Sequence, residues 1–215
     1  MIPTATPAPA TAAVSDALDR LGLLGSIHGI GPLAPGQQAL GPVFTVKYEA
    51  VDERGGTVGD FLDDVPVGSV IVIDNDARTD CTVWGGIMTR LAESRGVAAT
   101  VISGVCRDTA IATGIGYPIW SAGRFMRTGK DRVRLAAVQV DLEIDGVRIR
   151  PGDVLVGDED GVVVVPAERS AEVLELARRI EVIEDAIVAD VENGSSLKDA
   201  RARHGYHALQ TRDDR

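Results

Sequence analysis

The pattern of apolar and polar positions changes along this chain at Trp120. Before it, the pattern predicts a buried strand over Val70–Ile73, a helix over Trp84–Ser94 and a second strand, VAATVI, over residues 97–102. A strand–helix–strand order predicts a βαβ unit, so part of the sheet is expected to be parallel. The helix residues expected to face inward are Ile87 and Leu91, with Met88 as a further candidate.

Beyond Trp120 the segment AAVQVDLEIDGVRIRPGDVLVGDEDGVVVVP alternates with period two. Turn residues at Asp145-Gly146, Pro151-Gly152 and Asp160-Gly161 predict hairpins there. A long helix is predicted from about Ala167 to Asn193, with Gly194 as its cap. Its apolar face is formed by Val173, Leu176, Ile180, Ile183 and Ile187.

The first half of the chain contains two further elements. TAAVSDALDRLGLLGSI predicts a helix with Thr11 as its N-cap, and PVFTVKYEAV predicts a strand. With 215 residues and 45% hydrophobic content the chain can bury a full core, and it contains no Gly-, Ser- or Pro-rich linker. We therefore expect a flexible N-terminal tail over residues 1–10, one α/β domain over 11–197 and a polar tail over 198–215.

Composition narrows the classes of partner. The net charge is −10 and the basic residues are interleaved with acids, which argues against nucleic-acid binding. The chain has no apolar run of the roughly 18–20 residues that cross a bilayer. Cys81 and Cys106 form no metal-spaced cluster and are interpreted as two small buried residues, although the sequence leaves a disulfide between them open. This cysteine usage suits a reducing cytoplasm, where we expect the protein.

The segment SGVCRDTAIATGIGYPIW places Arg107 and Asp108 just after the strand VAATVI. Loops at this position of α/β proteins commonly carry functional groups. With only three scattered histidines, any metal is expected to be a hard cation such as Mg²⁺ or Mn²⁺, and Asp108 is the best ligand candidate. Arg107 could hold a substrate carboxylate through its forked guanidinium. The alternative, which spacing alone slightly favours, is that Asp108 caps a short helix through Ala112.

Gly85 and Gly86 open the helix that precedes this strand. A helix N-terminus presents free N–H groups to anions, and glycine lets a ligand approach the backbone. A glycine pair more often marks only a turn, so this signal is weak by itself. Nucleophilic and Schiff-base catalysis have little support, because the sequence has neither a Gly-x-Ser-x-Gly motif nor a lysine in a suitable context.

Four segments, in this order, resemble the RraA-like family: TAAVSDALDRLG, WGGIMTRLAESRGVAATVISGVCRDTAIATGIGYPIW, GDVLVGDEDGVVVVP and IEDAIVADVENGSSL. The resemblance runs from about Thr11 to Leu197. The family includes class II 4-hydroxy-4-methyl-2-oxoglutarate / 4-carboxy-4-hydroxy-2-oxoadipate aldolases, and also RraA, a binding protein that inhibits an RNA-processing endonuclease. It implies a β/β/α sandwich with a long C-terminal helix, assembled as a homotrimer or homohexamer with active sites between subunits.

The resemblance also implies roles for individual residues. Asp108 would be the one protein ligand of Mg²⁺ or Mn²⁺, and Arg107 would hold the pyruvyl end of a 2-oxo acid substrate. Glu184 would reach the metal waters of an adjacent subunit. The catalytic set implied in this way is Arg107, Asp108 and Glu184. The substrate-binding set is Gly85, Gly86, Ile87, Met88 and Arg107, in which backbone N–H groups of the helix start hold the substrate carboxylate.

One position departs from the aldolase pattern. Those aldolases carry an aspartate 21 positions before the arginine, where this chain has Gly86. Either Glu184 or another acid, such as Asp16, replaces the missing aspartate, or the chemistry differs. The expected function is metal-dependent cleavage of a 4-hydroxy-2-oxo diacid to pyruvate and a second 2-oxo acid, with oxaloacetate decarboxylation as a companion activity. The alternatives are a non-catalytic RraA-like regulator and a family enzyme acting on another 2-oxo or hydroxy acid; the aspartate after Arg107 favours a metal enzyme over the regulator.

Overall fold

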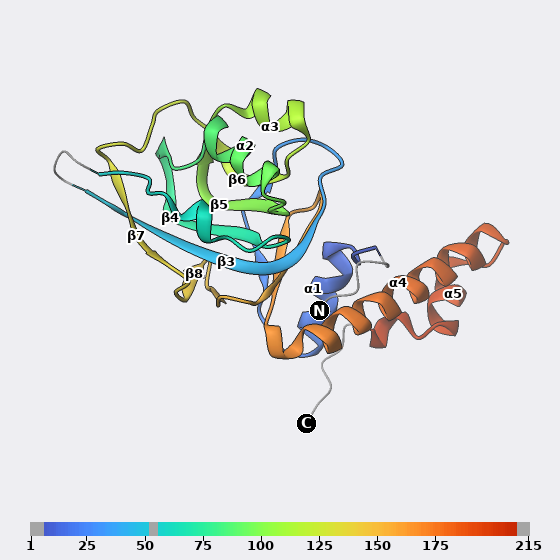
Figure 1. Ribbon diagram of the computed structural model, residues 1–215. Coiled ribbons are helices and arrows are strands. Elements are labelled where there is room, and N and C mark those ends of the chain that lie inside the picture. The colour runs from blue at the N-terminus through green and yellow to red at the C-terminus, as the bar shows by residue number, and fades with distance from the viewer. Residues whose placement is uncertain (1–6, 52–55, 210–215) are drawn as a thin grey trace.

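The computed structural model describes residues 7–51 and 56–209 (Figure 1). Its helices are α1 (Thr11–Arg20), α2 (Gly86–Ser94), α3 (Thr109–Ile115), α4 (Ser170–Glu192) and α5 (Leu197–Arg203), with 3-10 turns η1 (Phe61–Asp64), η2 (Ala167–Arg169) and η3 (Tyr206–Ala208). Its strands are β1 (Ser26–Ile27), β2 (Gly31–Pro32), β3 (Ala39–Ala50), β4 (Val70–Thr82), β5 (Ala99–Cys106), β6 (Ile119–Arg124), β7 (Val133–Val138), β8 (Leu142–Ile144), β9 (Val147–Ile149), β10 (Val154–Gly157) and β11 (Val162–Val165).

Nine of the described strands form one mixed sheet in the order β1-β11-β10-β3-β4-β5-β6-β2, with β7 paired to β3. The neighbours β3, β4, β5 and β6 run parallel, and α2 and α3 connect β4 to β5 and β5 to β6. The predicted βαβ unit is therefore confirmed. Because β4, β5 and β6 are parallel, their carboxyl ends meet at one edge of the sheet, where ligands of such sheets usually bind.

Side-chain alternation along β4 separates two parts of the core. Ile71 and Ile73 face the helix layer of α2 and α3, whereas Val70 and Val72 face the hairpin β8–β9 on the other side. Trp120, fully buried, belongs to the second part. The fold is thus a mixed α/β arrangement of helices, sheet and a small second sheet, and these layers hold the carboxyl edge of β4–β6 in place.

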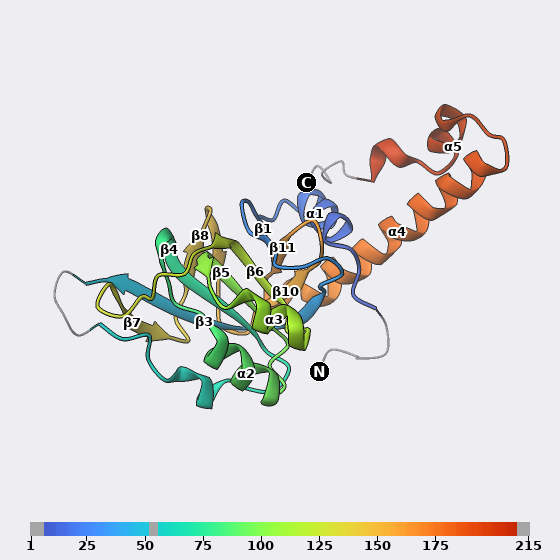
Figure 2. The ribbon, with the colours of Figure 1, turned by 90° about the horizontal axis from the view of Figure 1, so that it is seen from above.

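A third part of the core lies between β10–β11 and the helices α1 and α4. The predicted apolar face of α4 is confirmed for Val173, Ile180 and Ile187, which are buried. The other two predicted residues, Leu176 and Ile183, are only partly buried. Figures 1 and 2 show the second half of α4 projecting away from the sheet, with α5 folded back beside it. Part of the expected C-terminal tail is therefore helical. The predicted N-terminal tail lies mostly outside the described residues. None of the helices within 7–51 and 56–209 combines the length and apolar composition needed to span a membrane.

The prediction that Ile87 faces inward is wrong, because its side chain is 85% exposed. Helix α2 begins at Gly86 instead of Trp84, so Ile87 occupies its second position at the open N-terminal end. Thr89 and Ala92 are the side chains buried instead, and Met88 and Leu91 pack partly on the core.

Two other details differ from the prediction. No hairpin forms at Pro151-Gly152, since β9 pairs with β8 in the small sheet, whereas β10 pairs with β3 and β11. That turn carries the chain from one sheet to the other. Thr11 is the first residue of α1 and not its N-cap, and its hydroxyl donates to the Asp158 carboxylate over 2.6 Å. The hairpins at Asp145-Gly146 and Asp160-Gly161 are confirmed.

Candidate functional site

The carboxyl end of β5 delivers Arg107 and Asp108 to the edge of the sheet, as predicted. The backbone N–H of Arg107 donates to the Trp84 carbonyl over 3.1 Å, which ties the loop after β5 to the segment that leads into α2. The start of α2 and the end of β5 are therefore neighbours in space, although 22 residues separate Gly86 from Asp108. The strand–helix–strand unit therefore brings the glycine pair at the start of α2 next to Arg107 and Asp108 after β5.

Asp108 has a left-handed backbone conformation, with φ 57° and ψ 34°. Such a conformation is uncommon for a residue other than glycine and is found preferentially at functional sites. Although Asp108 is the N-cap residue of α3, its side chain makes no capping bond to that helix. Its Oδ2 instead accepts the backbone N–H of Gly86 over 2.8 Å and so caps α2. The capping alternative was correct in kind but placed on the wrong helix.

The Arg107 guanidinium lies against the same carboxylate, with 3.7 Å between Arg107 Nε and Asp108 Oδ2. Both side chains are half-exposed, at 39% and 44%, so the pair is open to a ligand. Asp108 Oδ1 and the Nη groups of Arg107 have no hydrogen-bond partner among the described residues. An exposed pair of this kind contributes little to stability, which leaves its charges available for binding.

The glycine pair permits this close approach. A Cβ at Gly85 would lie 2.8 Å from Asp108 Oδ2, so any larger residue would push the carboxylate away. A Cβ at Gly86 would lie 2.5 Å from Ile111 Cδ1, which means that Ile111 fills the space of a side chain at position 86. The N–H groups of Ile87 and Met88, at the second and third positions of α2, have no partner within the described part of the chain.

Arg107 and Asp108 line a surface depression of about 210 Å³. Sequence reasoning missed the three of its residues that come from β6 and the loop after it. Strand pairing would have predicted them, because β6 runs parallel to β5 and places Arg124 directly opposite Cys106. The lining residues are Cys106, Arg107, Asp108, Thr109, Arg124, Phe125 and Met126.

Both cysteines are free and buried, as expected. Burial raises the pKa of the Cys106 thiol, and its Sγ lies 3.5 Å from the Ser121 hydroxyl. A thiol held neutral in this way is a poor nucleophile, so Cys106 serves as the floor of the depression.

Glu184 lies on α4 and, within one chain, is not brought to the depression. Figures 1 and 2 both show α4 well apart from α2 and α3. Burial raises the pKa of Glu184, and the nearby carboxylates of Asp16, Glu181 and Asp185 raise it further. Asp16, on α1, is thus a neighbour of Glu184, and neither residue lines the depression. Neither acid fills the place of the missing aspartate in the isolated chain.

The residues present fit a hard cation with a single protein ligand. Among the described residues no group of three or more His, Cys, Asp or Glu side chains could enclose a metal ion. Asp108 nevertheless offers the unpaired Oδ1 of an exposed carboxylate beside open space. Mg²⁺ commonly keeps several waters and takes only one or two carboxylates, so one such oxygen is a sufficient anchor.

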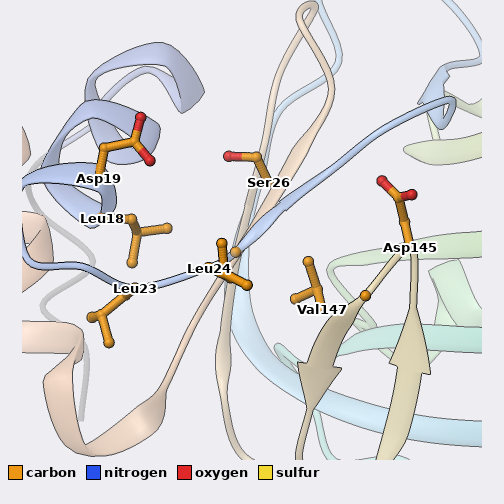
Figure 3. A pocket seen from close by; sticks show the side chains of 9 residues that line it. Leu18, Asp19, Leu23, Leu24, Ser26, Asp145 and Val147 are labelled. Atoms are coloured by element: carbon orange, nitrogen blue, oxygen red, sulfur yellow. The ribbon is translucent and has the colours of Figure 1, made fainter.

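A second depression, of about 200 Å³, lies between the α1–β1 connection and the β8–β9 hairpin (Figure 3). Leu23, Leu24 and Val147 of the hairpin line it, and Asp19 and Asp145 lie on opposite sides. The Asp145 carboxylate already accepts the backbone N–H of His28 over 2.8 Å. Asp19 and Ser26 are the other polar side chains that line this depression, and its lining contains no arginine or lysine.

The amino-acid sequence is similar to a known protein family and to several of its members. The family model described as RraA-like, aldolase/RraA, matches residues 11–164. The chain belongs to the RraA-like family. Protein DlpA of Legionella pneumophila is 38% identical over 199 residues, 91% of this chain and 32% of DlpA, so the chain spans about a third of that relative. A Halalkalibacterium halodurans protein named "Putative 4-hydroxy-4-methyl-2-oxoglutarate aldolase" is 34% identical over 178 residues, 82% of this chain and 81% of the relative.

Solved structures of RraA-like proteins share this fold. An uncharacterized protein from Pseudomonas syringae pv. tomato aligns with a TM-score of 0.84 at 47% identity, covering 90% of this chain and 92% of that one. Streptomyces coelicolor RraAS2, described as an unusual member of the RNase ES inhibitor RraA protein family, aligns with a TM-score of 0.73 at 28% identity, covering 82% and 89%. The family resemblance is therefore confirmed, and it includes both aldolase and RraA names.

Proposed function

We propose that this RraA-like protein is a divalent-metal-dependent pyruvate lyase that cleaves a 4-hydroxy-2-oxo diacid and decarboxylates oxaloacetate. The observation that carries the proposal is that Arg107 and Asp108 line one open depression, while the Asp108 carboxylate also accepts the N–H at the N-terminus of α2. A carboxylate, a guanidinium and free backbone N–H groups are together what a 2-oxo acid and its metal ion require.

The roles follow from which groups are free. The N–H groups of Ile87 and Met88, together with Arg107, would bind the carboxylate of the pyruvyl end. The Gly86 N–H is already bonded to Asp108, so it fixes the carboxylate and does not itself contact substrate. A bound Mg²⁺ or Mn²⁺ would supply Lewis-acid polarisation of the 2-oxo group. The Arg107 charge would offset the negative charge that develops on that oxygen.

Proton handling decides which reaction is faster. Retro-aldol cleavage needs a base for the 4-hydroxyl proton, whereas decarboxylation of oxaloacetate does not. Asp108 is the only carboxylate among the residues that line the depression, and Ile111 occupies the space beside Gly86. We therefore expect oxaloacetate to be the better substrate of the isolated subunit. In a homotrimer or homohexamer, Glu184 of an adjacent subunit would be the candidate for the missing acid.

Pyruvate release tests the proposal. Oxaloacetate and 4-hydroxy-4-methyl-2-oxoglutarate are each offered with Mg²⁺, with Mn²⁺ and with EDTA, and the protein-dependent rate is measured. We expect turnover with either metal and its loss with EDTA. Arg107→Ala should lower the rate on the order of 10³-fold, because it removes substrate binding and charge stabilisation together. Arg90→Ala, which removes an exposed charge of α2, should not lower it. No metal-dependent release from either acid would exclude the proposed reaction.

A second candidate function is partner binding without catalysis. It is favoured by Gly86 and by the similarity to RraAS2. Arg107→Ala separates the two functions, since it should abolish turnover in an enzyme and leave binding of a protein partner at a distant surface intact. A third candidate, an enzyme acting on another 2-oxo or hydroxy acid, would show the same metal and Arg107 dependence with different substrates.

A further inference from the structure

A second guanidinium lies at the proposed active site. Arg124 is the last residue of β6, and its strand register places it opposite Cys106, one residue before Arg107. The loop after β6 is held there as well, because the Phe125 N–H donates to the Cys106 carbonyl over 2.9 Å. Arg107 and Arg124 therefore line the same depression from two adjacent strands.

The Arg124 guanidinium is anchored on one side and open on the other. Its Nη2 donates to the Leu33 carbonyl over 2.7 Å, which fixes the position of the planar group. Its Nε and Nη1 have no partner among residues 7–51 and 56–209. A guanidinium oriented by one backbone bond, with its remaining donors free, is preorganised to receive a carboxylate.

The charges of the depression are unusual for this chain. The protein has a net charge of −10, yet two arginines and a single carboxylate line this depression. With Arg107 assigned to the pyruvyl end and Asp108 to the metal ion, the positive charge of Arg124 has no counterpart. A ligand with a second anionic group would supply it. A neutral or monoanionic substrate would make no such pair and would leave the exposed Arg124 guanidinium in water.

We propose that Arg124 binds the distal carboxylate of a 2-oxo diacid and makes the site selective for diacids over monoacids. The proposal rests on the proposed function for the placement of the pyruvyl end at Arg107. It gives a residue of β6 a role in substrate selection that is separate from metal binding by Asp108 and from carboxylate binding at the start of α2.

A binding experiment tests this without depending on turnover. The probes are 2-oxoglutarate and 2-oxopentanoate, which have the same chain length and differ by the distal carboxylate, and neither has the 4-hydroxyl that retro-aldol cleavage needs. Their dissociation constants are measured by calorimetry in Mg²⁺ for the wild type, Arg124→Met, Arg124→Lys and Arg90→Met. We expect the wild type to prefer the diacid and Arg124→Met to weaken diacid binding by about 10- to 100-fold. Binding of the monoacid should change by less than about twofold, because it makes no contact with Arg124.

The two controls make the result interpretable. Arg124→Lys keeps the charge without the fork and should lose only part of the preference, and Arg90→Met removes an exposed arginine outside the depression and should retain all of it. Unchanged monoacid binding also shows that Arg124→Met is folded; if that variant does not fold, Arg124→Lys decides. Equal weakening of both acids, or of neither, would overturn the role of Arg124 while leaving the proposed function intact. A wild type that binds neither acid and releases no pyruvate would overturn both.

Discussion

Two depressions of nearly equal volume, about 210 and 200 Å³, differ in what their walls offer. The first has Arg107, Arg124 and Asp108 around it, each with donor or acceptor atoms that have no partner among the described residues. The second, shown in Figure 3, is lined by leucines, a hairpin and two carboxylates without a cationic side chain, and the Asp145 carboxylate accepts the backbone N–H of His28. Volume alone would not distinguish them.

The difference arises from where each depression lies on the sheet. The first lies at the carboxyl edge of parallel strands, where chain reversals leave a helix N-terminus and loop side chains facing one point. The second lies between a loop and an antiparallel hairpin, whose backbone groups pair with each other. Parallel topology thus concentrates unpaired polar groups, and the proposed binding of an anion in the first depression rests on them.

The largest expected effect comes from replacing one aspartate in each depression by asparagine and comparing the two variants. Asp108 and Asp145 each accept one backbone N–H, over 2.8 Å in both cases. Replacement by asparagine keeps an acceptor for that bond and removes the charge. Asp108→Asn should lower metal-dependent pyruvate release by roughly 10³-fold, because the anchor of the cation is lost, whereas Asp145→Asn should leave it unchanged. Steady-state rates with Mg²⁺ measure both; equal activity of the two variants would contradict the assignment of Asp108.

The second largest expected effect is a faster retro-aldol cleavage when an aspartate is introduced at position 86. Gly86→Asp introduces the acid found in the aldolases, and Ile111→Ala removes the side chain whose Cδ1 would lie 2.5 Å from the new Cβ. The double variant should raise release from 4-hydroxy-4-methyl-2-oxoglutarate on the order of 10²-fold, with little change for oxaloacetate. Ile111→Ala alone is the control. A folded double variant with unchanged selectivity would argue that position 86 does not handle the proton.

The smallest effect concerns Glu184, which lies outside both depressions. Because burial and neighbouring carboxylates raise its pKa, the folded protein binds this proton more tightly than the unfolded chain does. The ionised group therefore destabilises the fold at neutral pH, and the cost disappears below an unfolded glutamate pKa of about 4.3. Glu184→Gln should raise Tm by about 1–2 °C at pH 7 and leave it unchanged near pH 3.5.

Thermal unfolding at the two pH values measures this change, with the exposed Glu93→Gln as the control. An unchanged or lower Tm at pH 7 would contradict the interpretation. A simultaneous fall in pyruvate release would show that Glu184 acts on the site of another subunit.

Much of the fold could be predicted from local pattern. The period of the apolar positions predicted α2 and β5 with errors of two to four residues at their ends, because burial on one face imposes that period on each element separately. For β4 it predicted only Val70–Ile73, and the strand continues to Thr82. The exposed Ile87 was missed because the exact start of α2 depends on a bond from Asp108, 22 residues away in the chain. Helix boundaries set by distant groups are not encoded in the local pattern.

The sequence by itself determined the family, the parallel strand–helix–strand unit, and the position of Arg107 and Asp108 after a buried strand. The tertiary structure decided which helix Asp108 caps, that Ile111 fills the space beside Gly86, and that Arg124 lies next to Arg107. The reason is physical: periodicity and turn residues act over one element, whereas strand register and side-chain contact join segments far apart in the chain. The chemistry of this site depends on contacts of the second kind.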